Sequence, residues 1–487
     1  MSTVRVRFAP SPTGYLHVGG LRTALYNFLF ARKNRGVFVL RIEDTDRARY
    51  VEGAVENLIQ TLHWAGLEYD EGPARGGSAG PYVQSERLAL YREHVDTLLK
   101  SGKAYHAFDT PEELAEMRKS QEKSGVPQKQ FRRWLSLSPS EVERKLREGA
   151  QAVVRMKVPD GETVTLEDVI RGRVEFASDL IDDQVLLKSD GYPTYHLANV
   201  VDDHLMGISH VIRGEEWLPS TPKHVLLYRY FGWEVPVFAH LPLLLNPDKS
   251  KLSKRQGDVA VEEYRAKGYL PEALVNFVAL LGWNPGTEQE IFSLTELIEQ
   301  FSLERVGKAG AVFNIEKLNS INSIHLRSRT DGETLKLEMV KAALGQKGWS
   351  GFTDEYLLSV IGLMKERVER VEDFAADAAY FFADPEAYDE QARAKSWKPE
   401  TAAHLRAVRA KLAGLGSFDH SAVEGAVRKT AEELAIGASH IIHPLRLALT
   451  GVSKGPGLFE LIAVLGKEKT LKRIDRACER LGDLPKT

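Results

Sequence analysis

The first 40 residues restrict the fold more strongly than any other part of the chain. Residues 4–8 alternate apolar and charged side chains and are followed by Pro10, which is typical of a short strand. Apolar residues then recur at helical spacing over residues 19–32, and Gly36 precedes a second apolar strand at residues 37–40. A strand, loop, helix and strand in this order predict the start of a parallel α/β sheet, in which ligands bind beyond the carboxyl ends of the strands.

The remaining chain shows two changes of pattern. Residues 83–187 combine β-like runs with two helices that begin with capping boxes, at residues 110–113 and 138–141, which predicts a mixed α/β insert. Alternating strand and helix patterns resume until about residue 245, and beyond about residue 256 the pattern is helical almost to the end. At 487 residues the chain is long enough for about three domains. We therefore expect an α/β part with an insert, followed by an all-helical part.

The composition is that of an ordinary globular protein, and a single cysteine is compatible with a reducing compartment. Hydrophobic residues make up 43% and charged residues 27%, and no apolar run approaches the roughly 20 residues that span a bilayer. The N-terminus enters a strand pattern directly, without a secretory signal, so we expect a cytoplasmic protein that does not bind membranes. The single cysteine, Cys478, can form neither an internal disulfide nor a thiolate zinc site. A net charge of −3 requires that any nucleic-acid partner meets a local basic face.

The loop between the first strand and the first helix has the residues of a nucleotide site. Helix N-termini offer N–H groups and the positive end of the helix dipole to phosphates. Gly19 and Gly20 leave room for an adenine or a ribose against bare backbone, and His17 can donate to a phosphate. By itself, a histidine before two glycines is more often an ordinary helix start. These residues therefore indicate a phosphate site only in combination with a second one.

The second candidate segment is the basic run Lys251-Leu252-Ser253-Lys254-Arg255, which follows a strand pattern and precedes the helical part. Taken alone, such a run is usually a solvated basic loop. The two segments nevertheless both follow strands that can end at the same edge of the sheet. Together they predict one shared site that grips a triphosphate.

The two segments resemble the two signatures of class I aminoacyl-tRNA synthetases. The string over residues 7–20, with its continuation over residues 41–47, resembles glutamyl-tRNA synthetases of the bacterial type specifically. A glutaminyl enzyme is expected to differ in residues 9–13 and to carry a β-rich C-terminal half. The likeness covers essentially the whole chain, with further matching stretches at residues 191–199, 211–217 and 456–459.

The resemblance implies a multidomain protein with an α/β part and an all-α part. It implies ATP-dependent ligation of L-glutamate to the 3′ end of glutamate tRNA through a glutamyl-adenylate, with ATP entering as its Mg²⁺ complex. The protein is expected to act as a monomer, and an enzyme that also glutamylates glutamine tRNA is the alternative. The implied parts are a Rossmann-type catalytic domain at residues 1–82 and 188–255, an acceptor-stem-binding insert at 83–187, a helical stem-contact domain at 256–325 and a helical anticodon-binding region at 326–487.

The resemblance also implies roles for three groups of residues. His17, Lys251 and Lys254 would stabilise charge on the leaving pyrophosphate. The residues expected to bind ATP are His17, Gly19, Gly20, Lys251, Ser253 and Lys254. Those expected around glutamate are Arg7, Ser11, Glu43, Tyr195, Asn199 and Arg213. Those expected at the anticodon are Arg367, Pro456 and Leu458.

The implied roles agree with the chemistry of adenylation. The attacking carboxylate is already ionised, so the reaction needs alignment and cationic stabilisation and no general base. Arg7 can form a forked pair with the side-chain carboxylate of glutamate while Glu43 receives the ammonium group. Glutamine would leave the arginine charge poorly paired, which costs roughly 3–5 kcal/mol, or on the order of a thousandfold in selectivity.

Two departures from the wider family affect the expectations. Gly20 stands where other class I enzymes carry a second histidine, so His17 would act without a histidine partner. Some relatives carry zinc-binding cysteines in the insert, where this chain has residues 105–109 without cysteine, so no zinc is expected.

Other possible functions are a catalytically inactive RNA-binding relative, a short paralogue that glutamylates a modified tRNA base, and a nucleotidyltransferase with a similar first signature. Retention of both signatures and a helical half of about 160 residues favour the synthetase.

Overall fold

The computed structural model describes residues 3–124, 132–252, 260–328, 333–371 and 373–482. The chain divides into two compact units, which are described separately. The first unit comprises residues 1–265 and 271–318, and the second comprises residues 266–270 and 319–487. The predicted combination of an α/β part with a helical part is confirmed.

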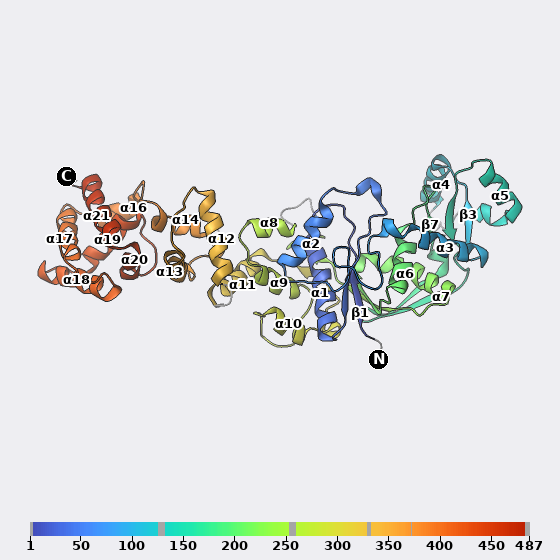
Figure 1. Ribbon diagram of the computed structural model, residues 1–487, viewed down its shortest axis with the longest axis horizontal. Coiled ribbons are helices and arrows are strands. Elements are labelled where there is room, and N and C mark those ends of the chain that lie inside the picture. Colours follow the sequence, from blue (N-terminus) through green and yellow to red (C-terminus); the bar gives the residue numbers. More distant parts are fainter. Residues whose placement is uncertain (1–2, 125–131, 253–259, 329–332, 372, 483–487) are drawn as a thin grey trace. The chain divides into compact units, whose positions relative to one another are not determined.

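The N-terminal strand, helix and strand form as the sequence pattern predicts (Figure 1). Strand β1 (Arg5–Phe8) pairs in parallel with β2 (Val37–Leu40), and helix α1 (Val18–Lys33) connects them. Residues of α1 that face the sheet are fully buried, including Leu21 and Leu25. His17 caps the helix because its Nδ1 accepts the backbone N–H of Gly20 at 3.0 Å.

The first unit also contains a four-stranded sheet in the order β6-β5-β9-β8, whose strand β8 contacts β1. Strand β8 (His210–Gly214) pairs in parallel with β9 (Val237–Leu241), and β5 (Thr163–Asp168) pairs antiparallel with β6 (Gly172–Ala177). Asp168 at the end of β5 pairs with Phe238 of β9, so the β5–β6 hairpin joins the same sheet as strands that lie later in the chain. The sequence pattern did not predict β5, because a long-range pairing supplies its partner and the local apolar signal is short.

The rest of residues 83–187 forms a small α/β layer. The three-stranded antiparallel sheet contains β3 (Ala104–Ala107), β4 (Val153–Met156) and β7 (Val185–Leu187). Both predicted capping boxes form, at Thr110 and Ser138. Helices α3 (Leu88–Lys100), α4 (Pro111–Ser124) and α5 (Pro139–Arg147) accompany the sheet. One continuous hydrophobic core joins this layer to the four-stranded sheet, with Tyr91, Val154, Leu197, Val211 and Phe238 among its members.

The first unit also contains further helices and a short pair of strands. The elements are α2 (Ala54–Trp64), α6 (Tyr195–Leu205), α7 (Thr221–Phe231), α8 (Val261–Ala266), α9 (Pro271–Ala279) and α10 (Leu294–Gln300). Strand β10 (Leu244–Leu245) pairs in parallel with β11 (Ala311–Val312), which is an exception to the predicted helical pattern beyond residue 256. Helix α11 (Ile315–Ser328) begins in this unit and continues into the second.

The second unit is helical. Its core depends on Arg473, which is 2% exposed and donates to the carbonyl oxygens of Tyr380, Ala383 and Leu449 while pairing with Asp384 at 2.9 Å. These bonds pin the ends of two helices to a third, because unpaired carbonyls at a helix end need a donor. The elements are α12 (Glu333–Gln346), α13 (Asp354–Met364), α14 (Asp373–Asp377), α15 (Ala379–Phe382), α16 (Glu390–Ser396), α17 (Thr401–Ala413), α18 (His420–Glu433), α19 (Ser439–Thr450), α20 (Leu458–Leu465) and α21 (Lys467–Leu481).

Among the residues that the structure describes, no helix combines the length and the apolar character needed to cross a membrane. Within the same residues, no group of three histidine, cysteine, aspartate or glutamate side chains has the arrangement of a metal site.

Candidate active site

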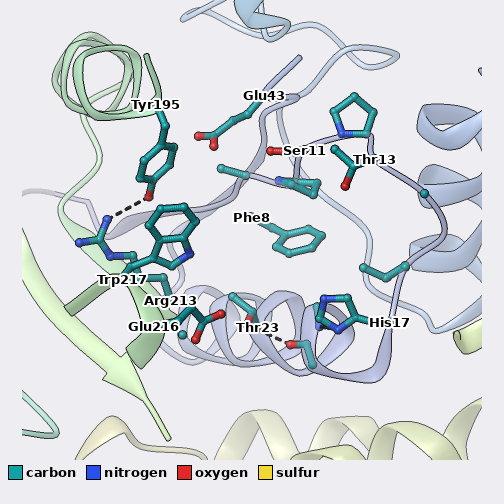
Figure 2. Close-up of a pocket in the computed structure, with 18 of the residues that line it drawn as sticks. Phe8, Ser11, Thr13, His17, Thr23, Glu43, Tyr195, Arg213, Glu216 and Trp217 are labelled. Carbon is teal, nitrogen blue, oxygen red and sulfur yellow. Dashed lines mark hydrogen bonds between the residues drawn. The ribbon is translucent and has the colours of Figure 1, made fainter. Parts of the chain in front are cut away.

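A pocket of about 900 Å³ lies where β1 and β8 end and α1 begins (Figure 2). This is the position that a parallel α/β sheet gives to a ligand. Nine of the residues expected to bind ATP or glutamate line it, although they come from five separate stretches of the chain. These residues are Arg7, Ser11, His17, Gly19, Gly20, Glu43, Tyr195, Arg213 and Lys251.

The two signature segments meet at this pocket. The backbone of His17 forms an antiparallel bridge with Ala260, and the N–H of Val261 donates to Leu16 at 2.9 Å. Lys251 forms a bridge with Leu245 and lines the pocket. The chain on both sides of residues 253–259 is therefore held at the pocket that the first signature lines. Ser253 and Lys254 lie outside the described residues.

The glycines of the first signature are required by the side chains beside them. A Cβ on Gly19 would lie 3.0 Å from two ring atoms of His17, and a Cβ on Gly20 would lie 2.6 Å from Leu16. A Cβ on Gly19 would therefore press on the ring that caps α1, and a Cβ on Gly20 would require the side chain of Leu16 to move. Because Nδ1 of His17 accepts from the backbone, the neutral ring carries its proton on Nε2 and donates from that atom.

Arg7 is held by groups of the protein itself. Its Nε donates to Oδ1 of Asp203 at 3.0 Å and its Nη2 donates to Asn199 at 3.2 Å. Within the described part of the chain, no hydrogen bond involves Nη1, so this edge of the guanidinium remains for a ligand in the pocket. Asn199 does not line the pocket; it contacts Arg7 and Arg41 and is 2% exposed.

Glu43 and Arg41 form the next part of the same buried network. Arg41 is fully buried and donates to Asp203 at 2.7 Å and to Glu43 at 3.1 Å. Burial of the Glu43 carboxyl raises its pKa to about 7, against the opposing effect of Arg41 and Arg7. A carboxyl group that faces the pocket and is expensive to ionise favours a cationic ligand, because such a ligand restores the lost solvation.

Arg213 differs from Arg7 in having only neutral partners. It is 4% exposed and donates to Tyr195 at 3.0 Å, His224 at 3.2 Å, His240 at 3.1 Å and Thr221 at 2.9 Å. None of the described carboxylates lies within 4.0 Å of it. Burial lowers the pKa of His240, and burial together with Arg213 lowers the pKa of His224 well below its ordinary value, so both rings are neutral acceptors. Arg213 is therefore a buried cation that lacks a direct anionic partner.

Tyr195 links the two halves of the pocket. Its hydroxyl accepts from Arg213, so its own proton can be donated to a ligand (Figure 2). Arg213, Glu43 and Arg7 all act electrostatically on this hydroxyl, which places the three charged groups around one point. A compound that carries two carboxylates and one ammonium group meets complementary charges there.

Several pocket residues were missed by the sequence reasoning. Trp217 lines the pocket and packs on Tyr195 with 4.2 Å between ring centroids, although it is 36% exposed. A tryptophan four residues after Arg213 was the available signal, since aromatic rings stack on bases. Arg41 and Asp203, which do not line the pocket but bond Glu43 and Arg7, were also missed; the signal was two charged residues on faces that the apolar pattern buries.

The residues expected at the anticodon lie in the second unit. Arg367 is exposed just after α13, and Arg446 donates to the carbonyl of Pro456 at 2.8 Å. Burial lowers the pKa of Arg446, and the nearby charge of Arg367 acts in the same direction. The side chain of Leu458 is 4% exposed and packs inside the unit at the start of α20.

Known proteins match both units. The family model described as the catalytic domain of class I tRNA synthetases for E and Q matches residues 3–320, and the anticodon binding domain model matches residues 336–478. A glutamate–tRNA ligase of Chloroherpeton thalassium is 57% identical, with 98% of both chains covered, and one of Chlorobium phaeobacteroides is 54% identical with the same coverage.

Solved structures agree with these matches. A glutamate tRNA ligase from Elizabethkingia meningosepticum, in complex with its amino acid, is 44% identical with a TM-score of 0.92, covering 99% of this chain and 100% of that one. A glutamate–tRNA synthetase from Elizabethkingia anophelis is 43% identical with a TM-score of 0.89, covering 98% of this chain and 100% of that one. The chain therefore belongs to the glutamate–tRNA ligase family of class I tRNA synthetases.

Proposed function

We propose that the chain ligates L-glutamate to the 3′ end of glutamate tRNA through a glutamyl-adenylate, with ATP as its Mg²⁺ complex. The observation that carries the assignment to glutamate is Arg213, a buried pocket cation whose hydrogen-bond partners are all neutral. Burial of such a charge is costly until an anion pairs with it. The side-chain carboxylate of glutamate supplies that anion, whereas the amide of glutamine does not.

The remaining polar groups of the pocket fit the other parts of the substrate. The open edge of Arg7 adds a second cation for the same carboxylate, and Tyr195 donates to it. Glu43 receives the ammonium group, and Ser11 is placed to contact the amino acid. His17 and Lys251 contact the phosphates of ATP, and Trp217 offers an aromatic face to the base.

The first step, formation of the glutamyl-adenylate, needs no proton acceptor because the attacking carboxylate is already ionised. The α-carboxylate of glutamate attacks the α-phosphorus of ATP, and pyrophosphate leaves with its charge balanced by His17, Lys251 and Lys254. A terminal ribose hydroxyl of the tRNA next attacks the carbonyl carbon of the adenylate, the bond from that carbon to the phosphate oxygen breaks, and AMP leaves with its phosphate taking up the hydroxyl proton. We place the acceptor end at residues 83–187, the stem at 256–325 and the anticodon at 326–487. Cytoplasm and a monomeric state are the proposed setting.

The test is charging of purified glutamate tRNA and glutamine tRNA with radiolabelled glutamate. Label on glutamate tRNA alone supports the proposed function. Label on both tRNAs identifies an enzyme that does not discriminate between them. Label on neither, with intact ATP binding, refutes the proposal.

A further inference from the structure

A chain of hydrogen bonds continues from Arg213 away from the pocket and into the β5–β6 hairpin. Nε of Arg213 donates to Nε2 of His240 at 3.1 Å, and Nδ1 of His240 lies 2.6 Å from Oδ2 of Asp168. His240 is fully buried on β9 and Asp168 is 4% exposed at the end of β5. Asp168 is 72 residues from His240 in the chain, and the pairing of β5 with β9 brings them together.

The donors and acceptors in this chain allow only one arrangement. Arginine nitrogens donate and cannot accept, so Nε2 of His240 must be the unprotonated ring nitrogen. The proton of the neutral ring then lies on Nδ1 and is donated to Asp168. Asp168 is held in place in turn, because it accepts from the backbone N–H groups of Ile170 and Arg171 at 2.9 and 2.8 Å. The carboxylate thus keeps the proton on Nδ1, so the imidazole nitrogen that faces Arg213 is an acceptor.

We propose that Asp168 and His240 are positioning residues for Arg213, and that they set the affinity for glutamate without touching it. This proposal rests on the proposed contact between Arg213 and the substrate carboxylate. Asp168 fixes the Nδ1–H tautomer of His240, and Nε2 of His240 then fixes the plane of the guanidinium. The hairpin that supplies Asp168 belongs to residues 83–187, so this stretch of the chain also shapes the amino-acid site.

The imidazole between the two charges explains why Arg213 can remain available to substrate. A carboxylate in direct contact with a guanidinium takes up donors that a ligand could otherwise use. Arg7 shows the direct arrangement, since Asp203 occupies its Nε. At Arg213 the imidazole of His240 separates the guanidinium from Asp168. The negative charge of Asp168 therefore offsets part of the buried positive charge, while the neutral imidazole accepts from Arg213 and orients its side chain.

Two substitutions of His240 separate the acceptor from the donor. In His240→Gln the amide oxygen can take the place of Nε2 and still accept from Arg213. In His240→Asn the amide nitrogen can take the place of Nδ1 and still donate to Asp168, but the acceptor for Arg213 is lost. Asp168 itself is a poorer target, because it also accepts from the backbone N–H of His240 at 3.1 Å. Asp183→Asn is the matched control. Asp183 is a buried carboxylate that bonds Tyr105 and Arg132 and contacts none of the three hydrogen-bonded residues Arg213, His240 and Asp168.

The readouts are KM for glutamate, KM for ATP and kcat in tRNA charging, together with the melting temperature. We expect His240→Asn to raise KM for glutamate about 10- to 100-fold, the value of a hydrogen bond to a charged group. KM for ATP should change less than about twofold, and His240→Gln should recover most of the glutamate affinity. Asp183→Asn should lower the melting temperature without a selective effect on glutamate.

Equal glutamate KM values for His240→Asn and the parent overturn the proposal, as do equal increases in His240→Asn and His240→Gln. Arg213→Gln separates the two levels of inference. If it leaves KM for glutamate unchanged, the proposed role of Arg213 fails. If it raises KM for glutamate while His240→Asn does not, the role of Arg213 stands and only the positioning by His240 is wrong.

Discussion

The protonation of Glu43 should control the use of glutamate near neutral pH. Burial raises the pKa of this carboxyl to about 7, and only its ionised form can pair with the ammonium group of the substrate. Below pH 7 the empty site is therefore protonated in a growing fraction of molecules. We expect kcat/KM for glutamate to fall by about tenfold for each pH unit below that pKa, since binding must release the proton.

The histidines next to Tyr195 and Arg213 do not account for such a profile. Burial lowers the pKa of His196 to about 4 and lowers that of His224 and His240, so these rings stay neutral while Glu43 titrates. The assay is tRNA charging between pH 5.5 and 8.5, with kcat/KM for glutamate measured for the parent and for Glu43→Gln. The variant should be slower at pH 8 and should lose the slope that the parent shows. Titration of ATP or tRNA affects both enzymes and cancels in their ratio.

The same carboxyl should affect folding stability with a defined sign. Its pKa is higher in the folded state than the ordinary value of 4.5, so the folded state binds more protons between pH 4.5 and 7. The free energy of unfolding should therefore increase as pH falls through this window, by at most on the order of 3 kcal/mol from this group. Glu43→Gln should flatten that dependence. Identical pH profiles of activity for the parent and Glu43→Gln would refute the reasoning.

Four further substitutions or assays test other parts of the proposal. Arg7→Gln should lower kcat/KM for glutamate by about a hundredfold to a thousandfold and also lower the melting temperature, because Asp203 loses one of its two arginines; unchanged glutamate kinetics would contradict this. Lys254→Ala should remove most activation, measured as charging rate, while circular dichroism stays that of the parent. Arg367→Gln should relax discrimination between the glutamate and glutamine anticodons, measured by charging both tRNAs, without slowing activation. Exchange of pyrophosphate into ATP should be nearly silent in RNase-treated enzyme until glutamate tRNA is added; equal exchange with and without the tRNA would show that activation is independent of it.

The helix start at His17 shows what local patterns predict well. The strand ends at Phe8 and the helix begins after His17. Both depend on the spacing of apolar residues and on the capping hydrogen bond between His17 and Gly20, which are properties of neighbouring residues. The same is true of the capping boxes at Thr110 and Ser138. His17, Gly19, Gly20 and Lys251 line one pocket because parallel strands direct their following loops to the same edge.

The sequence by itself determined many of the local elements of this protein, the family to which it belongs and nine of the residues that line the pocket. Only the tertiary structure decided which charges are paired inside the protein. Arg7 and Asp203 lie 196 residues apart, and His240 reaches Asp168 only because β5 joins the sheet beside β9. Pairings of this kind leave no periodic trace, since each depends on how distant strands and helices pack and not on the residues next to either partner. For the same reason, the sequence showed arginines suited to a carboxylate but not that Arg7 is already bound to an acid and Arg213 to none.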